Sequence, residues 1–262
     1  MRRPAADGAG GRRLRAVLRL APALLLAASA ASAGEVTVAV AANAAEAVEA
    51  LGADFEERTG HRVAVTVGST GKLYAQILHG APFDVFLAAD QERPRLLVEQ
   101  GIAVEGSRVT YAVGRLVLWS PDPEVDAAAE TLRKGAFRRL AIANPDLAPY
   151  GAAARETLQE LGLWKSLRGK IVVGENVGQA FAMVASGNAE LGFVSLASAL
   201  SPRHGREGSY WEIPEHLHTP IHQDSVLLDR ARNNQAARDF HEFLNTPRAR
   251  ETMESFGLEP RY

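Results

Sequence analysis

The stretch VTVGSTGKLYAQI, which runs from Val65 to Ile77, joins a strand-like run to a helix-like run through a turn of small residues. A turn that feeds a helix in this way exposes the unpaired N–H groups of the helix N-terminus, which can bind an anion. The stretch therefore predicts a strand–turn–helix unit. It also raises a choice between a nucleotide phosphate loop and a site for some other anion.

The spacing of this turn does not fit a nucleotide phosphate loop. Such a loop has the pattern G-x-x-x-x-G-K-[ST], whose last residue binds Mg²⁺. Gly71 and Lys72 are in place, but Thr66 occupies the position of the first glycine and Leu73 that of the final hydroxyl residue. The turn therefore indicates a more general anion site or a purely structural connection.

The N-terminus has the composition of a secretory leader. Six arginines and one acidic residue lie among the first 19 residues, and the apolar stretch LAPALLLAASAASA follows over Leu20–Ala33. A basic segment, a short apolar segment and a final Ala-x-Ala predict a signal peptide at 1–33, cut after Ala33. The apolar stretch is shorter than the roughly 20 residues that span a membrane, so an uncleaved anchor is the weaker alternative.

Composition narrows the class of protein. The chain contains no cysteine, which excludes disulfides, thiolate metal ligands, cysteine nucleophiles and an acylated lipoprotein anchor. Without residues 1–33 the formal net charge changes from -2 to -7, so nucleic acid is not an expected partner. Export without disulfides is typical of a bacterial periplasm, and the 229 remaining residues suffice for one large domain or two lobes.

Strand-like and helix-like segments alternate in the first half of the mature chain. Apolar alternation and helical periodicity predict strands at 35–41, 61–67 and 84–88, and helices at 44–58, 71–79 and 92–100. Asn43, followed by Glu46, has the spacing of a helix N-cap with its capping-box partner. This order of elements favours a parallel sheet with helices on both faces.

A second alternating unit follows a long extended run at 107–120 that is broken by Gly114. Another extended run at 219–229 precedes two C-terminal helices within 233–256. The second unit comprises predicted strands at 140–144, 171–174 and 191–195, and predicted helices at 149–161 and 177–186. Two α/β units joined by two extended segments predict two lobes with mainly parallel sheets. Lobe I comprises 34–114 and 222–262, lobe II comprises 115–221, and a ligand cleft lies between them.

Four strand-to-helix turns share a composition that suits an anion. Each combines small residues with a cap or hydroxyl, and none carries a charge at its tip; they are Ala42-Asn43, Gly68-Ser69-Thr70-Gly71, Pro149-Tyr150-Gly151 and Asn176-Val177-Gly178. If the four helix N-termini converge, each contributes roughly half a positive charge and free N–H donors. The structural alternative treats Asn43, Asn176, Ser69 and Thr70 as helix caps, with Tyr150 and Val177 packed in the core.

The chain resembles the periplasmic molybdate-binding proteins of ABC importers, which are class II solute-binding proteins. The resemblance covers Glu35 to Leu258, and its GAPFDVFLAAD run is particularly specific. It is carried by VAVAANAAEAVEAL, VGSTGKLYAQILHGAPFDVFLAADQERP, RLVLWS, IANPDLAPYGAAARETL, ENVGQAFAMVASGNAELGFVSLA and FHEFLNTPRARETMESFG. It implies a two-lobed type II fold joined by two crossover strands. It further implies a monomeric periplasmic receptor, not an enzyme, that captures molybdate or tungstate for an inner-membrane permease and needs no cofactor.

The resemblance also implies a ligand set, since the family binds tetrahedral oxyanions through hydroxyls, amides and backbone N–H groups of these turns. Molybdenum would be present only as the bound oxyanion. The matching positions are Ala42, Asn43, Ser69, Thr70, Tyr150 and Val177. Many family members have Ser where this chain has Asn43, and Tyr where it has Ser195. We therefore expect Tyr150 to supply the phenol and Asn43 an amide donor.

Several alternatives stay open at this point. A sulfate or ferric-iron receptor would share the fold, although Tyr74, Tyr111 and Tyr150 do not form the tyrosine and carboxylate cluster that iron needs. An exported hydrolase would need a base beside Ser69 or Ser195, and no motif supplies one. The three histidines of EHLHTPIHQD, namely His216, His218 and His222, suggest a metal site only weakly. Lys72 is expected to point to solvent.

Overall fold

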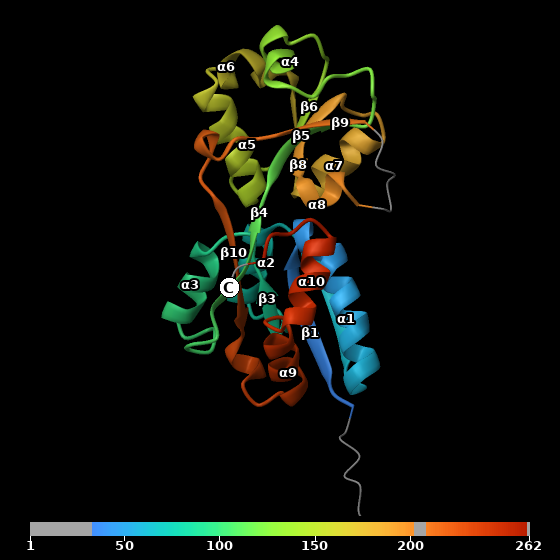
Figure 1. Cartoon of the computed structure of the whole chain (residues 1–262). Coiled ribbons are helices and arrows are strands. Elements are labelled where there is room, and N and C mark those ends of the chain that lie inside the picture. Colours follow the sequence, from blue (N-terminus) through green and yellow to red (C-terminus); the bar gives the residue numbers. More distant parts are fainter. Residues whose placement is uncertain (1–32, 202–207, 261–262) are drawn as a thin grey trace, which may run out of the picture. The chain divides into compact units, whose positions relative to one another are not determined.

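Two five-stranded sheets form the framework of residues 33–201 and 208–260, the part of the chain that the computed structural model describes (Figure 1). The first sheet has the strand order β2-β1-β3-β10-β4 and the second has the order β7-β6-β8-β5-β9. The strands of the first sheet are β1 (Glu35–Ala41), β2 (Arg62–Gly68), β3 (Val85–Leu87), β4 (Val109–Gly114) and β10 (Ile221–Leu227). Those of the second are β5 (Leu116–Ser120), β6 (Leu140–Ala143), β7 (Ile171–Gly174), β8 (Leu191–Ser195) and β9 (Ser209–Glu212).

Each sheet has four strands running in one direction and one running against them. In the first sheet β1 pairs in parallel with β2 and β3, whereas β10 is antiparallel to both β3 and β4. In the second sheet β6 pairs in parallel with β7 and β8, and β5 is antiparallel to β8 and β9. This confirms the predicted two-lobed fold with mainly parallel sheets.

The chain passes between the sheets twice, from β4 to β5 and from β9 to β10. We keep the predicted boundaries, 34–114 with 222–262 and 115–221, as the working definition of lobe I and lobe II. The predicted leader at 1–33 lies outside the described residues except for Ala33. No helix among residues 33–201 and 208–260 is long and apolar enough to cross a membrane.

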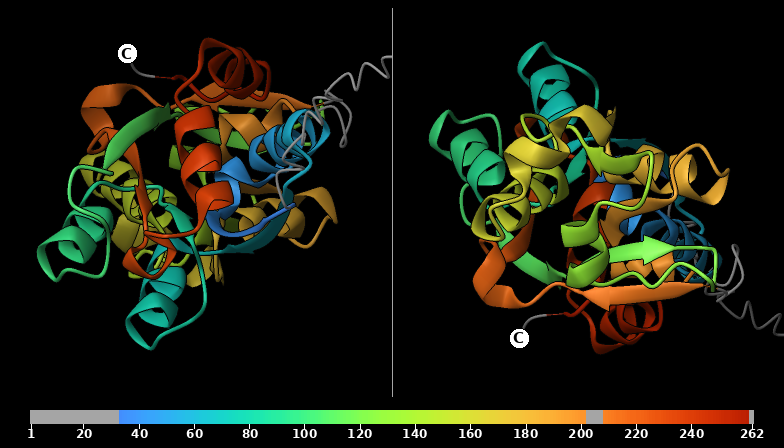
Figure 2. Two further views of the ribbon diagram at one scale, coloured as in Figure 1. Left: turned by 90° about the horizontal axis from the view of Figure 1, so that it is seen from below. Right: turned by 90° about the horizontal axis from the view of Figure 1, so that it is seen from above.

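Helices cover both faces of the lobe I sheet because strand β1 directs apolar side chains alternately to one face and the other. Val36, Val38 and Val40 pack in one cluster with α1, α9 and α10, whereas Ala39 packs in another with α2 and α3. The end-on view of Figure 2 shows the red C-terminal helices and the blue-green helices α2 and α3 on opposite sides of the sheet. The lobe I helices are α1 (Ala45–Thr59), α2 (Thr70–Leu78), α3 (Glu92–Glu99), α9 (Gln235–Phe243) and α10 (Pro247–Ser255).

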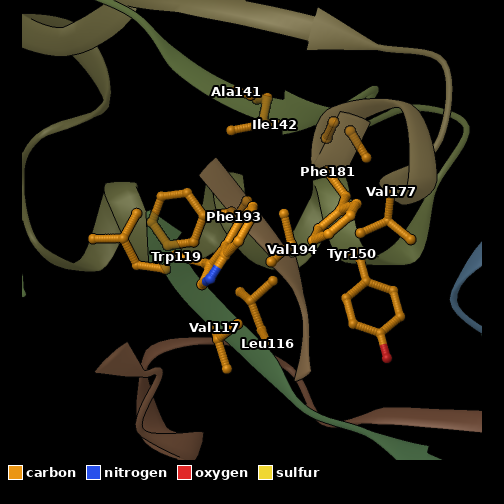
Figure 3. Close-up of a cluster of buried hydrophobic side chains, with 14 of the residues drawn as sticks. Leu116, Val117, Trp119, Ala141, Ile142, Tyr150, Val177, Phe181, Phe193 and Val194 are labelled. Carbon is orange, nitrogen blue, oxygen red and sulfur yellow. The ribbon is translucent and has the colours of Figure 1, made fainter. Parts of the chain in front are cut away.

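The core of lobe II is built around aromatic rings on β5, β8 and α7 (Figure 3). Trp119 stacks on Phe181 with ring centroids 4.8 Å apart and planes 19° apart. Tyr150 lies at the edge of this cluster, and its hydroxyl is directed away from the apolar side chains. The lobe II helices are α4 (Ala129–Lys134), α5 (Pro149–Glu160), α6 (Trp164–Leu167), α7 (Val177–Ala185) and α8 (Leu196–Ala199).

The predicted elements agree with the structure to within a few residues, with two kinds of exception. Four elements were not predicted, namely α4, α6, α8 and β9, because runs of four to six residues are too short to show periodicity. The predicted cap at Asn43 is wrong. Helix α1 has Ala44 as its N-cap with no side-chain cap bond, since Asn43 lies inside the 3-10 turn η1 (Ala42–Ala44).

A buried histidine makes the fold sensitive to acid. His241 of α9 is buried, and its Nε2 lies 3.4 Å from Ser225 Oγ of β10. Burial lowers the pKa of His241 from 6.5 to about 4, because the charged imidazolium is poorly solvated there. Below pH 6.5 this histidine takes up a proton in the unfolded chain, whereas in the folded chain it stays neutral until the pH falls to about 4. Acid therefore favours unfolding over this pH range.

We therefore predict that His241→Leu reduces the loss of stability between pH 7 and pH 4 by up to about 3 kcal/mol relative to the unsubstituted protein. The measurement is urea unfolding of both proteins at several pH values in this window. The carboxylates titrate in both proteins, so only the difference between the two profiles reports His241. Parallel profiles would show that this histidine does not set the acid sensitivity.

Candidate functional site

The four turns selected from the sequence surround one small cavity between the two sheets. All six predicted site residues line it, and the space inside it that a water-sized sphere can reach is about 10 Å³. This is far smaller than the roughly 300–1,000 Å³ of pockets for drug-sized molecules and close to the minimum that holds one water molecule, so the cavity suits only a very small ligand. The full lining is Ala41, Ala42, Asn43, Gly68, Ser69, Thr70, Ala89, Ala148, Pro149, Tyr150, Asn176 and Val177.

The register of two parallel strand pairs brings the turns together. Ala41 at the end of β1 is paired with Gly68 at the end of β2, so the first two turns leave the lobe I sheet side by side. In lobe II, Ala143 at the end of β6 is paired with Gly174 at the end of β7. Ligands of open α/β sheets bind beyond the carboxyl ends of the strands, which is where these turns lie.

Three helices begin at the cavity and leave their first N–H groups without helical partners. These are α2 at Thr70, α5 at Pro149 and α7 at Val177. Proline has no backbone N–H group, but at the first position of α5 this costs no hydrogen bond, because an N–H there would have no helical partner in any case. The lobes also touch beside the cavity, where the N–H of Gly71 donates to the carbonyl of Leu147 at 2.8 Å.

The three hydroxyls that line the cavity each accept a bond from a protein N–H group. Ser69 Oγ accepts from the backbone N–H of Lys72 at 3.4 Å, and Thr70 Oγ1 accepts from that of Ala89 at 3.0 Å. Tyr150 Oη accepts from Gln223 Nε2 at 3.5 Å. Because each oxygen has an N–H donor, each hydroxyl keeps its own hydrogen for another acceptor.

The side chain of Asn43 is only partly satisfied by the chain itself. It is 5% exposed, and its Nδ2 donates to Gln223 Oε1 at 2.8 Å. Its Oδ1 is buried and has no hydrogen-bond partner within residues 33–201 and 208–260. A buried polar atom without a partner costs about 1–3 kcal/mol, so it marks a place where the chain alone does not complete the hydrogen bonding.

The cavity carries no charged side chain in its lining. Lys72 and Glu175 form an ion pair between the lobes at 2.8 Å, but both lie outside the lining and are 49% and 41% exposed. Lys72 therefore reaches solvent as predicted, while also meeting the opposite lobe. Burial raises the pKa of Tyr150 above its ordinary value, which keeps the phenol protonated and able to donate at neutral pH.

Two of the predicted helix caps are present and also line the cavity. Ser69 is the N-cap of α2, and Asn176 is the N-cap of α7, where its side chain accepts from the N–H of Gln179 at 2.9 Å. Asn176 itself was predicted only as a cap, not as a site residue. The structural and the binding interpretations of these turns are therefore compatible, since a cap fixes the turn that lines the cavity.

Three residues beside the site were not selected from the sequence. Gln223 and Tyr111 come from the strands β10 and β4, far along the chain from the turns. Gly114 ends β4 at a close approach, because a Cβ there would lie 2.2 Å from Tyr150 Oη and 2.6 Å from Gln223 Nε2. The available signal was the polar stretch His222–Ser225 within the predicted extended run, in which Gln223 and Asp224 are both buried.

The alternative sites lack the groups that they need. No cluster of three metal-ligating side chains occurs in the part of the chain that the structure describes, so the histidines at 216, 218 and 222 do not form one. Tyr111 and Tyr150 do come together at Gln223, contrary to expectation, but no carboxylate lines the cavity beside them for ferric iron.

The hydrolase alternative likewise finds no base at its candidate serines. Ser195 caps α8 and shares a hydrogen bond with Ser198 Oγ at 2.8 Å. Ser69 accepts the N–H of Lys72, and within the described ranges neither serine bonds to a histidine. A serine nucleophile needs such a base within hydrogen-bond reach, so neither is activated here.

Comparison with known proteins gives relatives over nearly the whole chain. A "Molybdate-binding protein ModA" of Azotobacter vinelandii is 47% identical over 244 residues, covering 93% of this chain and 96% of that protein. One of Rhodobacter capsulatus is 47% identical over 229 residues, covering 87% and 89%. Among solved structures, the periplasmic molybdate-binding protein of Azotobacter vinelandii superposes with a TM-score of 0.83 at 39% identity, covering 87% of this chain and 100% of that one.

These relatives are named as binding proteins and not as enzymes, which agrees with the expectation from the sequence. The pattern of the family described as "Bacterial extracellular solute-binding protein" matches residues 36–259. That match covers both sheets and all four turns of the cavity. The chain belongs to the family of bacterial extracellular solute-binding proteins.

Proposed function

We propose that this protein is the receptor of an ABC importer, and that it captures molybdate in the cavity between its lobes and delivers it to the permease. The observation that carries the proposal is a small cavity between the lobes that is lined by hydroxyls and three helix N-termini and carries no charged side chain. The 47% identity to two proteins named as molybdate-binding supports the choice of ligand. We propose Ala42, Asn43, Ser69, Thr70, Tyr150 and Val177 as the binding residues.

Uncharged groups can hold a dianion here because many of them point to one place. Each helix N-terminus contributes roughly half a positive charge, and α2, α5 and α7 all begin at the cavity. The hydroxyls of Ser69, Thr70 and Tyr150 add donors whose oxygens are already engaged. Away from water these bonds are electrostatically stronger than at the surface, which offsets the unfavourable net charge of the mature chain.

Donor-rich lining favours an anion that carries no proton. Monohydrogen phosphate would direct its O–H at a donor and leave bonds unmade, at a cost of about 1–3 kcal/mol. Sulfate has the right charge but shorter bonds to oxygen, so its hydrogen bonds in a cavity fitted to molybdate would be stretched. Tungstate is nearly the size of molybdate and should bind as well.

The location and assembly of the receptor follow from the same proposal. Membership of an extracellular solute-binding family supports a location outside the cytoplasm. We propose that residues 1–33 direct export and are removed, and that the mature protein works as a monomer in the periplasm. The cavity is lined by residues of both lobes of one chain.

Titration calorimetry with four oxyanions tests the ligand. We expect molybdate and tungstate to bind at micromolar protein concentration, and sulfate and phosphate to bind at least tenfold more weakly, which corresponds to about 1.4 kcal/mol. Absence of heat with both molybdate and tungstate would overturn the proposal. Phosphate binding as tight as that of molybdate would show that the unpaired acceptor Asn43 Oδ1 accepts the hydrogen of the anion, and would overturn the expected preference for an anion without a proton.

Substitutions that each remove one polar side chain of the cavity test whether the anion binds at these turns. Thr70→Ala and Asn43→Ala should each weaken molybdate binding by about 1–3 kcal/mol while the fold is kept, because each removes a polar partner of the buried anion. The matched control is Thr66→Ala, which removes an exposed hydroxyl of β2 four residues before Thr70. Unchanged affinity in both variants would mean that the ligand binds at other turns.

Removing the charge of Lys72 distinguishes this site from one in which a lysine binds the anion. Lys72→Ala should change molybdate affinity by less than about 1 kcal/mol, because an exposed ion pair contributes little. Glu175→Gln removes the other member of the pair and should have an equally small effect. A much larger loss in Lys72→Ala than in Glu175→Gln would indicate that the lysine binds the anion directly.

A further inference from the structure

Gln223 connects the side chains that the two lobes present to the cavity. It belongs to β10 of the lobe I sheet and is 0% exposed, although it does not itself line the cavity. We propose that Gln223 is a positioning residue that sets the hydrogen-bond directions of Asn43 in lobe I and Tyr150 in lobe II. This inference rests on the proposed function, since Asn43 and Tyr150 are two of the proposed ligand-binding residues.

The carbonyl end of the Gln223 amide is occupied from lobe I. Oε1 accepts from Asn43 Nδ2 at 2.8 Å and from Tyr111 Oη at 2.9 Å. Tyr111 also reaches the carbonyl of Ala88 at 3.1 Å, so its single hydrogen is shared between two acceptors. Two donors at Oε1 hold the amide in one orientation, because turning it over would set Nε2 against Asn43 Nδ2, donor against donor.

The amino end of the same amide then faces lobe II. Nε2 donates to Tyr150 Oη at 3.5 Å, so the phenol oxygen is used as an acceptor. A hydroxyl that accepts from the protein keeps its hydrogen to donate elsewhere, and Tyr150 lines the cavity. The amide thereby makes Tyr150 a donor toward a bound anion instead of a donor toward the protein.

The backbone around Gln223 is built to hold this contact. The neighbouring strand β4 ends in Gly114, where any Cβ would meet both Tyr150 Oη and Gln223 Nε2. The register of β10 against β4 shifts between Gln223 and Asp224. On the far side of that bulge Asp224 is anchored by Arg108 Nη1 at 2.9 Å and Thr110 Oγ1 at 2.6 Å.

Because β10 follows the return of the chain from lobe II, Gln223 sits where the two lobes are joined as well as beside the cavity. Asn43 and Tyr150 depend on one amide although they belong to different lobes. An oxyanion that accepts from both side chains is therefore bound by groups whose directions are set together.

A double-mutant cycle on molybdate affinity tests this role. Gln223→Met keeps the length of the side chain and removes both its polar ends. We expect it to weaken binding about tenfold, as expected when the partners of a buried hydrogen-bonding group are left unpaired. In a Tyr150→Phe background, which has no hydroxyl to orient, the same change should weaken binding by less than about threefold.

The control is Ser225→Ala, which alters another buried polar side chain of β10 and should leave affinity unchanged. Gln223→Glu is the second variant, for use if Gln223→Met does not fold. Its carboxylate still accepts from Asn43 and Tyr111 but also draws the hydrogen of Tyr150 away from the cavity, so binding should fall by more than about tenfold.

The outcomes separate the two proposals. Failure of the unsubstituted protein to bind molybdate or tungstate overturns the proposed function, and the role of Gln223 falls with it. Normal binding by the unsubstituted protein and also by Gln223→Met or Gln223→Glu overturns the role of Gln223 alone. Equal losses from Gln223→Met with and without the Tyr150 hydroxyl would show that Gln223 does not act through Tyr150.

Discussion

The cavity depends on the register of two parallel strand pairs, one in each lobe. Ala41 is aligned with Gly68, and Ala143 with Gly174, so the two strands of each pair end at the same level. The segments that follow these four strands then turn into helices side by side. A slip of one residue would send every side chain of a strand to the opposite face and would separate the turns. The alternating valines of β1, which pack against α1, α9 and α10, oppose such a slip in lobe I.

The electrostatic character of the site follows from this geometry. A single lysine or arginine would attract any anion, including those that carry a proton, whereas N–H groups and hydroxyls have directions and must each find an acceptor. The lining here contains no charged group, and the hydroxyls have oxygens that are already engaged by the protein. Recognition by many directed, neutral donors depends on shape and protonation state more than on net charge.

Binding and stability use the same residues without conflict. Ser69 and Asn176 cap the helices α2 and α7, and these caps hold the turns in the form that lines the cavity. Gly114 serves the packing of Tyr150 and Gln223, since no larger residue would fit. Among the side chains of the described residues, the one buried polar atom left unpaired is Oδ1 of Asn43, which belongs to a residue that lines the cavity.

The sequence by itself determined most of the elements, the two-lobed fold and the set of turns at the cavity. Those features are local: apolar periodicity marks strands and helices, and glycine, asparagine and hydroxyl residues mark the turns between them. The sequence could not say that Asn43 is not a helix cap, because the competing partner of its amide, Gln223, lies 180 residues away in the chain.

Only the tertiary structure decided which groups complete the site. Tyr111, Gly114 and Gln223 come from the strands beside the crossing between the lobes, and their local sequence pattern does not say which residues they contact. Their positions follow from the antiparallel pairing of β4 with β10, which sets Gln223 opposite Ala112 and Ile221 opposite Gly114. A contact between residues so far apart along the chain is fixed by the folded packing and not by local propensity, which is why it appears only in the structure.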